Sequence, residues 1–282
     1  LTTNTGHSAS LNVAVGGYSQ ANATSYYNTS VGYRALEDAT SHSNTAVGRQ
    51  CLSQSTSGTE NAAFGNMAMQ TSTSAAYSTA IGSQALYSAT SGSYNTAVGR
   101  SAAISLTTGS NNVSIGNNAH NSLTTGEHTT ALGVNAGYNG TSASYNVFLG
   151  NYAGRLTTSN SNVSIGYASL YNNTSGSLLT VVGQSALYYN TTGIHNTAFG
   201  SAALQTNTTG SYNTAVGLNA LLANTTADYG VAVGYQTLDA NTTGARNCAV
   251  GYTALSTNTT GNYNTALGSY ALNSQTTPNF NV

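Results

Sequence analysis

The sequence predicts an all-β fold, a parallel β-solenoid (a β-roll or β-helix) of about 16 coils with 16–17 residues in each coil. Three observations lead to this prediction. A glycine preceded by a large apolar residue recurs along the whole chain of 282 residues. The residues before that glycine alternate with a period of two, which is the period of a β-strand. Only 4% of the residues are charged, against roughly 25% in an ordinary soluble domain.

The recurring glycine defines a repeat that covers the chain. Of the fifteen intervals between these glycines, twelve are 17 residues long and three are 16. Self-similarity at a fixed period is typical of a solenoid, and a period this short excludes the usual helix-containing repeats. We therefore expect residues 1–282 to form a single continuous β-solenoid repeat domain that is uncapped at both ends. The glycines are Gly16, Gly32, Gly48, Gly65, Gly82, Gly99, Gly116, Gly133, Gly150, Gly166, Gly183, Gly200, Gly217, Gly234, Gly251 and Gly268.

The three residues before each glycine are predicted to form a β-strand, as in Thr45-Ala46-Val47. The first residue is usually β-branched, the second is usually small, and the third is Val, Ile, Leu or Phe. This alternation indicates a strand with one buried face, and we assign the large third residue to the core. The predicted core residues are Val47, Phe64, Ile81, Val98, Ile115, Leu132, Leu149, Ile165, Val182, Phe199, Val216, Val233, Val250 and Leu267.

A second element is predicted directly after the glycine. In many copies a small residue and a large apolar residue stand three and four positions later, as at residues 35–36, 85–86 and 203–204. We interpret this pair as a second short strand or a bend. In either case it would place a Leu side chain in the same core.

The remainder of each coil is predicted to be a turn, with Asn-Thr-Thr-Gly at residues 190–193 and 207–210 as examples. Asn and Gly suit left-handed turn conformations, and Thr hydroxyls bond neighbouring backbone groups. Asn-X-Ser/Thr is also the acceptor sequence for N-glycosylation, and the turns of a solenoid are expected to be exposed. Two interpretations therefore stay open, a recurring turn or a set of glycan acceptors. The candidate acceptors are Asn190, Asn207, Asn224, Asn241 and Asn258.

Stacking of the coils accounts for the low charge. Each residue of a solenoid lies above the same position of the preceding coil, so Asn, Thr and Tyr can pair with their own kind. Like charges in such a column would repel one another. Some Tyr directly follow the glycines, as at Tyr33, Tyr167, Tyr235 and Tyr252, and for these we favour stacking on neighbouring coils or subunits over an exposed role in carbohydrate or protein contact. One set of Tyr, five residues before the glycines, is predicted to stack at the edge of the core. This set is Tyr77, Tyr94, Tyr145, Tyr212, Tyr229 and Tyr263.

Composition and spacing argue against several kinds of functional site. Five Arg, no Lys and a net charge of −1 cannot neutralise a nucleic-acid backbone, and no apolar window is long enough for a membrane-spanning helix. His120, Glu127 and His128 are the one group that resembles a metal site, but a third His or a Cys is missing. Cys51 and Cys248 lie about twelve coils apart, too far for a disulfide. We therefore predict no catalytic residue, no cofactor, no metal and no enzymatic activity.

The repeat motif resembles that of a known class of fibre. Asn-Thr-Ala-Val-Gly, followed by Ala-Leu and Asn-Thr-Thr-Gly, resembles the glycine-punctuated repeats of bacteriophage tail-fibre and other viral fibre proteins. It is similar, more distantly, to the β-roll heads of trimeric autotransporter adhesins, whose coils are shorter than 17 residues. The resemblance implies a surface-exposed, usually trimeric β-solenoid fibre without catalytic residues. The motif stands at residues 44–48, 95–99, 196–200, 213–217 and 264–268.

The function predicted from these observations is structural. The chain is expected to be the repetitive shaft of an extracellular or virion fibre. A thin coil buries little core, so we expect self-association, as a trimer or as an end-to-end filament, with neither nucleic acid nor membrane insertion. The alternative is an adhesin-type module that recognises surface glycans or a host receptor. An ice-binding solenoid is less favoured, because the Thr pairs considered for it, such as Thr191-Thr192, are adjacent and lie in a turn.

Overall fold

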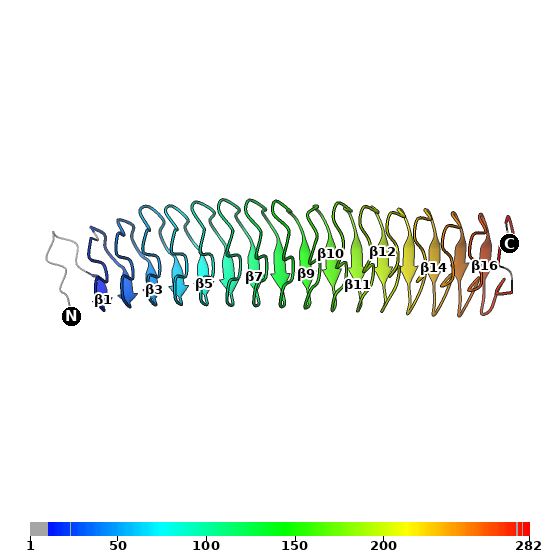
Figure 1. The fold of residues 1–282 in the computed structure, drawn as a ribbon, viewed down its shortest axis with the longest axis horizontal. Helices are drawn as coiled ribbons and strands as arrows, with labels where there is room; N and C mark the ends of the chain where they lie inside the picture. Colours follow the sequence, from blue (N-terminus) through cyan, green and yellow to red (C-terminus); the bar gives the residue numbers. More distant parts are fainter. Residues whose placement is uncertain (1–10, 23, 275, 278) are drawn as a thin grey trace. The chain divides into compact units, whose positions relative to one another are not determined.

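The computed structural model describes residues 11–22, 24–274, 276–277 and 279–282. The chain is an all-parallel β-solenoid of about 15 turns, as predicted, and the described residues contain no helix (Figure 1). It divides into two compact units, residues 1–144 (unit 1) and residues 145–282 (unit 2), and each is described by itself. The prediction of one continuous domain over residues 1–282, uncapped at both ends, stays a prediction.

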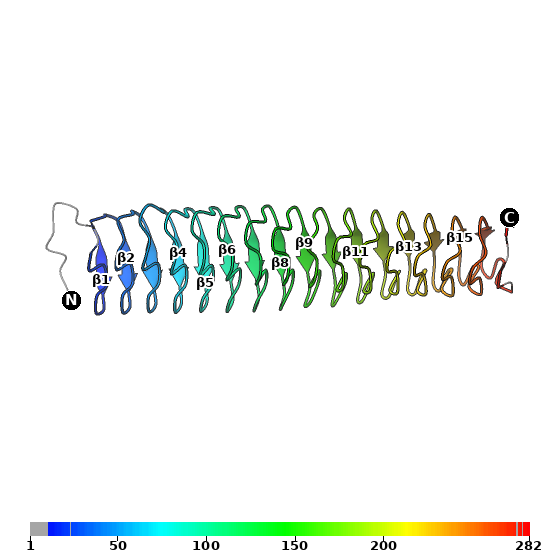
Figure 2. The same cartoon turned by 45° about the horizontal axis from the view of Figure 1, so that its top comes forward.

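Each coil contributes one strand of three residues that ends directly before a landmark glycine (Figure 2). The strands of unit 1 are β1 (Val13–Val15), β2 (Thr29–Val31), β3 (Thr45–Val47), β4 (Ala62–Phe64), β5 (Thr79–Ile81), β6 (Thr96–Val98), β7 (Val113–Ile115) and β8 (Thr130–Leu132). The strands of unit 2 are β9 (Val147–Leu149), β10 (Val163–Ile165), β11 (Thr180–Val182), β12 (Thr197–Phe199), β13 (Thr214–Val216), β14 (Val231–Val233), β15 (Cys248–Val250) and β16 (Thr265–Leu267).

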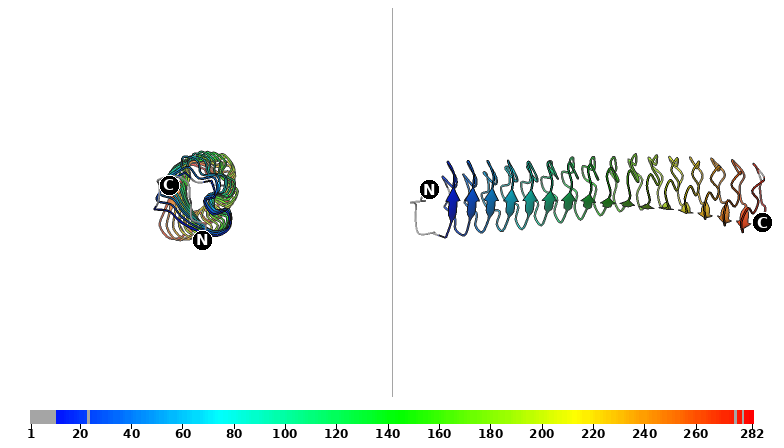
Figure 3. Two further views of the ribbon diagram at one scale, coloured as in Figure 1. Left: turned by 90° about the vertical axis from the view of Figure 1, so that its left-hand side faces the viewer. Right: turned by 90° about the horizontal axis from the view of Figure 1, so that it is seen from below.

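Within each unit, consecutive strands pair in parallel and in the register of the repeat. In β3 and β4, for example, Ala46 lies opposite Ala63 and Val47 opposite Phe64. Backbone hydrogen bonds outside the strands also join successive coils, as from Leu52 N–H to the Ala68 carbonyl at 3.0 Å. Seen end-on, each coil closes around a single narrow interior (Figure 3). The predicted stacking of like positions in columns is therefore confirmed.

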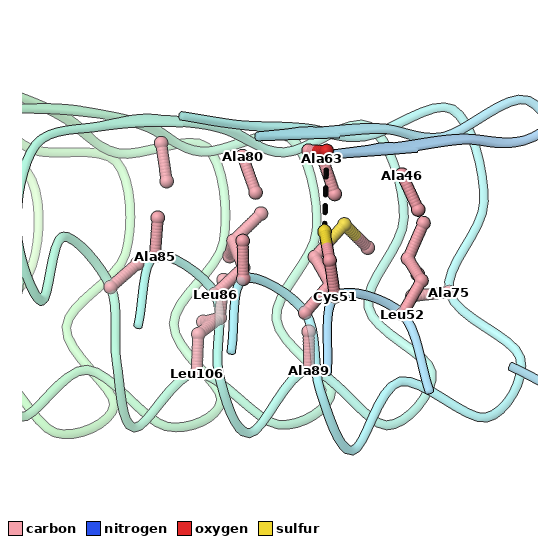
Figure 4. Packing of buried hydrophobic residues seen from close by; sticks show 14 of the residues in the cluster. Ala46, Cys51, Leu52, Ala63, Ala75, Ala80, Ala85, Leu86, Ala89 and Leu106 are labelled. Carbon is pink, nitrogen blue, oxygen red and sulfur yellow. Dashed lines mark hydrogen bonds between the residues drawn. The ribbon is translucent and has the colours of Figure 1, made fainter. Parts of the chain in front are cut away.

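The core is built from the small middle residues of the strands and from Leu residues on the opposite wall of the coil. Ala46, Ala63 and Ala80 have no exposed surface, and they face Leu52 and Leu86 across the interior (Figure 4). The coil is narrow, so a short side chain on the strand wall meets a long one on the opposite wall. The core of unit 2 is likewise built mainly from Ala and Leu.

The predicted phase of the strand alternation is wrong. The period of two is present, but the large third residue of each strand points out of the coil, and the small middle residue points in. Val181 and Leu187 of one coil are both fully buried, so the middle position also accepts a residue larger than Ala. Phe148 marks the upper limit of size at this position. This buried ring replaces the usual Ala, and the residue opposite it is Gly154, where an added Cβ would collide with the ring. The partly or largely exposed residues that were assigned to the core are Val47, Phe64, Ile81, Val98, Ile115, Leu132, Leu149, Ile165, Val182, Phe199, Val216, Val233, Val250 and Leu267.

The segment after the glycine is a bend rather than a second strand. Its second and fourth residues have left-handed backbone conformations, with φ of 56° at Arg34 and 51° at Leu36. A left-handed residue reverses the direction of the next side chain relative to a strand. Ala35 and Leu36 are therefore both fully buried although they are adjacent. The prediction that this pair places Leu in the core is confirmed.

Candidate functional site

The candidate glycan acceptors lie inside the coil, which contradicts their assignment as exposed turn residues. Asn207 is fully buried, and its Nδ2–H donates to Asn190 Oδ1 at 2.8 Å and to the Gly210 carbonyl at 2.9 Å. The same amide-to-amide bond recurs from coil to coil at 2.8–3.3 Å. A glycan would be attached at this buried and doubly bonded nitrogen, so the folded unit cannot present it. The ladder joins Asn173 to all five candidates, Asn190, Asn207, Asn224, Asn241 and Asn258.

A second Asn column, which sequence reasoning did not identify, directly precedes most of the strands. In unit 1 the buried Asn44 accepts the backbone N–H of Asn61 at Oδ1, at 2.9 Å, and its Nδ2–H donates to the Gly58 carbonyl at 2.9 Å. Asn196 and Asn213 are arranged in the same way in unit 2. One side chain therefore satisfies an acceptor and a donor of the next coil. The signal in the sequence was the recurrence of Asn directly before the predicted strands, as in the Asn-Thr-Ala-Val-Gly copies.

Aromatic side chains form stacked columns, but on the surface. Tyr77 and Tyr94 of unit 1 stack with ring centroids 5.0 Å apart and planes 4° apart. In unit 2, Tyr212 stacks on Tyr229 at 5.2 Å. About half of each of these side chains is exposed, so stacking is confirmed and a place at the core edge is not. Tyr212 also stacks on His195 at 5.0 Å, so rings cover both of its faces.

Arg246 extends the column of unit 2 without interrupting it. Its guanidinium carbon lies 5.3 Å from the ring centroids of both Tyr229 and Tyr263. Its Nη1–H also donates to the Tyr263 hydroxyl at 2.9 Å. A cation between two aromatic faces is stabilised by both ring quadrupoles. The Arg246 guanidinium therefore takes the place of one ring in the column, and the residues above and below it in the column are uncharged.

One group of aromatic residues in unit 2 departs from the regular columns. In this Tyr–Arg cluster the rings of Tyr152 and Tyr167 meet edge to face, with centroids 6.1 Å apart, and Tyr188 meets Tyr189 at 4.7 Å with planes 70° apart. Edge-to-face contacts leave ring faces uncovered, and about half of the Tyr167 and Tyr189 side chains is exposed. The cluster comprises Tyr152, Arg155, Tyr167, Tyr171, Tyr188 and Tyr189.

Arg155 holds the middle of the Tyr–Arg cluster. Its guanidinium carbon lies 5.3 Å from the Tyr171 ring centroid, and its Nη1–H donates to the Tyr171 hydroxyl at 3.0 Å. Partial desolvation and the neighbouring phenols of Tyr171 and Tyr189 raise the pKa of Tyr188. The Tyr188 phenol is therefore neutral at physiological pH and can act as a hydrogen-bond donor.

The outer strand face is the most regular surface of both units. We define it as the first and third residues of the strands, whose side chains point away from the core. The third residue is Val, Ile, Leu or Phe in every strand, and the first is Thr, Val, Ala or Cys. Exposure reaches 43% at Ile81, 48% at Leu132 and 55% at Phe199. This face carries no charged side chain.

The residues that resembled a metal site do not come together. His120 is fully buried, whereas Glu127 and His128 are exposed. Among the residues that the structure describes, no three His, Cys, Asp or Glu side chains are placed to hold a metal ion. Both cysteines are free, and burial raises the pKa of the Cys51 thiol to about 12. Within the same described part of the chain, no helix could cross a membrane.

His120 gives unit 1 a predicted sensitivity to acid. Its ring lies in the interior, with Nδ1 2.8 Å from the Ser114 hydroxyl, and burial lowers its pKa from 6.5 to about 3. The unfolded chain takes up this proton below about pH 6.5 while the folded unit does not. The contribution of the neutral His120 to the free energy of unfolding is therefore fully present above pH 6.5. Below that pH it falls by up to about 1.4 kcal/mol per pH unit. We expect unit 1 to lose about 2–3 kcal/mol between pH 7.5 and 4.5.

Urea unfolding at the two pH values measures this loss. In H120L the acid-induced loss of unfolding free energy should be smaller by about 2–3 kcal/mol, because Leu does not titrate. The variant should still fold, since Leu is the usual residue at this position, as at Leu86 and Leu204. The exposed His128→Gln variant is the control and should keep the wild-type pH dependence. An unchanged pH dependence in H120L would show that His120 is not the source.

No protein-family model matches this chain, and no curated protein matches it significantly.

Proposed function

We propose that the chain is a structural protein, the repetitive shaft of an extracellular or virion fibre. The observation that carries the proposal is the continuity of hydrogen bonding between coils. Backbone groups, buried Asn amides and Thr hydroxyls all bond to the next coil, as in the bond from Thr191 Oγ1–H to the Thr208 carbonyl at 2.9 Å. Bonds repeated in every coil stabilise an extended stack against tension and heat. We assign no catalytic step to the chain.

Immunoelectron microscopy tests this proposal. Antibodies raised against the 282-residue chain should label a fibre on the surface of the particle or cell that carries it. They should bind along its length, between base and tip. Label confined to the cell interior, or to a compact body without a fibre, would overturn the proposal.

The Tyr–Arg cluster favours a second candidate function, recognition of surface glycans. Pyranose rings pack against exposed aromatic faces, and Tyr, Asn and Ser supply hydrogen bonds. Tyr167 and Tyr189 offer such faces, whereas the rings of the regular columns cover one another. Asn172 and Gln184 are partly or fully exposed residues of the same coils.

We predict that Y167A and Y189A each weaken glycan binding by roughly tenfold or more, because each removes one stacking face. The measurement is binding of the chain to an array of cell-surface oligosaccharides. Y212A is the matched control and should bind like wild type, since the Tyr212 ring is stacked between His195 and Tyr229 in the same unit. Equal losses in all three variants, or no binding by the wild-type chain, would count against this candidate function.

An ice-binding role has less support than either. The outer strand face does carry Thr, at the first position of many strands, as in Thr79 and Thr96. The third position is apolar and varies in size from Val98 to Phe64. The flat Thr-X-Thr ranks that such a role needs are therefore absent from the strands.

A further inference from the structure

We propose that the outer strand face is a self-association surface, occupied in each case by the outer strand face of a second copy of this chain. The inference rests on the proposed structural function, because it concerns how shafts assemble side by side. It names a surface that the sequence had placed inside the core.

The exposed apolar side chains of the outer strand face recur in every coil of a unit. Each unit contributes eight third-position side chains, and their exposure reaches 43% at Ile81, 48% at Leu132 and 55% at Phe199. Monomeric proteins rarely expose contiguous apolar patches beyond a few hundred Å². Parallel sheets are also normally covered on both faces. Here the inner face is covered by the coil's own Leu residues, and the outer face of the single chain is open to solvent.

The periodicity of the face selects the occupant. Apolar side chains recur along it once per coil, at the strand spacing of about 4.8 Å. A partner must present ridges with the same spacing over many coils if the two faces are to interdigitate. A second copy of this chain meets that condition at every strand. Two such faces can pack at the usual sheet-to-sheet distance of about 10 Å.

Charge supports the same occupant. The face is neutral throughout, so two copies can approach without like-charge repulsion. Charged residues lie beside this face. Arg49 and Arg100 directly follow the glycines that come after β3 and β6, and both are exposed. An apolar centre with a polar rim is the usual anatomy of a protein–protein interface. The bend side of unit 1, by contrast, carries Glu37 and Asp38.

The test is to place a carboxylate on the face of the full 282-residue chain and to measure its oligomeric state. I81E changes unit 1 and F199E changes unit 2, and both side chains point to solvent in the single chain. Wild type should be oligomeric at micromolar concentration by light scattering and native mass spectrometry. Each variant should weaken association at least tenfold, since an unpaired carboxylate would be buried. Ser91→Glu, on an exposed turn of unit 1, is the matched control and should associate like wild type.

Circular dichroism and urea unfolding of the variants separate loss of association from loss of folding. The spectrum and the free energy of unfolding of each variant should match those of the dissociated wild-type chain, since both side chains point away from the core and about half of each is exposed. An oligomer that persists in both variants would overturn the proposal, because association would then use another surface. A wild-type chain that is monomeric at the same concentration would also overturn the proposal. Such a monomer found on a surface fibre would leave the structural function standing.

Discussion

Replacement of Gly166 by Ala is expected to destabilise unit 2 by about 3–5 kcal/mol. Gly166 has φ of +128°, a backbone conformation that side chains with a Cβ rarely adopt. The added Cβ would also lie 2.6 Å from the Gly183 carbonyl oxygen and 2.7 Å from its carbonyl carbon. The opposing atoms belong to the backbone of the next coil, which hydrogen bonds hold in place. Neither the strain nor the collision can be relieved by rotating a side chain.

Gly268 provides the matched control for this substitution. Its φ is +120°, but an added Cβ would meet no atom within 4 Å. Gly268→Ala should therefore lose only the strain contribution, about 1–3 kcal/mol. Urea unfolding of both variants measures the difference, and hydrogen exchange should show it as faster opening around β10 and β11. Equal losses in the two variants would show that close stacking of glycines contributes nothing beyond backbone strain.

Replacement of Asn207 by Ala is expected to cost unit 2 about 3–5 kcal/mol, through orphaned polar groups rather than lost volume. Asn207 donates to Asn190 Oδ1 and to the Gly210 carbonyl, and its own Oδ1 accepts from Asn224 Nδ2 at 2.8 Å. The substitution removes three hydrogen bonds from a site without exposed surface. Bonds in a continuous amide ladder also polarise one another. Thermal and urea unfolding measure the loss.

Two comparisons make the Asn207 prediction specific. Thr209→Ala changes an exposed turn residue two positions later and should alter stability by less than about 0.5 kcal/mol. Asn207→Asp keeps the shape but replaces the donating amide by a carboxyl group. It should be worse than Ala at pH 7, since burying an unpaired charge costs more than an unsatisfied hydrogen bond. A stability loss in Asn207→Ala no larger than in Thr209→Ala would contradict a structural role for the ladder.

The regularity of the sequence predicted the period, the strands and the stacking in columns. A strand of three residues before each glycine follows from local alternation and from the short interval between glycines. Stacking of Tyr on Tyr, as in Tyr212 and Tyr229, follows from placing equal positions of the repeat in successive coils. These features depend on neighbours in the sequence or on whole repeats.

The direction of the side chains could not be predicted in the same way. A period of two has two phases, and both place apolar residues on one face, Ala on one side or Val on the other. The buried Asn207 was assigned to a turn surface for a related reason, since Asn-Thr-Thr-Gly is a favourable turn in isolation. Its burial follows from the amide ladder, which exists only when several coils are stacked. The Tyr–Arg cluster likewise joins residues of successive coils.

The sequence by itself determined that this protein is a β-solenoid with one strand per coil and few charges, because those properties follow from a repeat. Only the tertiary structure decided what faces inward. Left-handed residues such as Arg34 and Leu36 turn two adjacent side chains into the coil, and on the opposite wall the middle residue of each strand, such as Ala46, faces inward while Val47 faces outward. The large strand residues are therefore exposed, and the surface they form is where we propose that two copies meet.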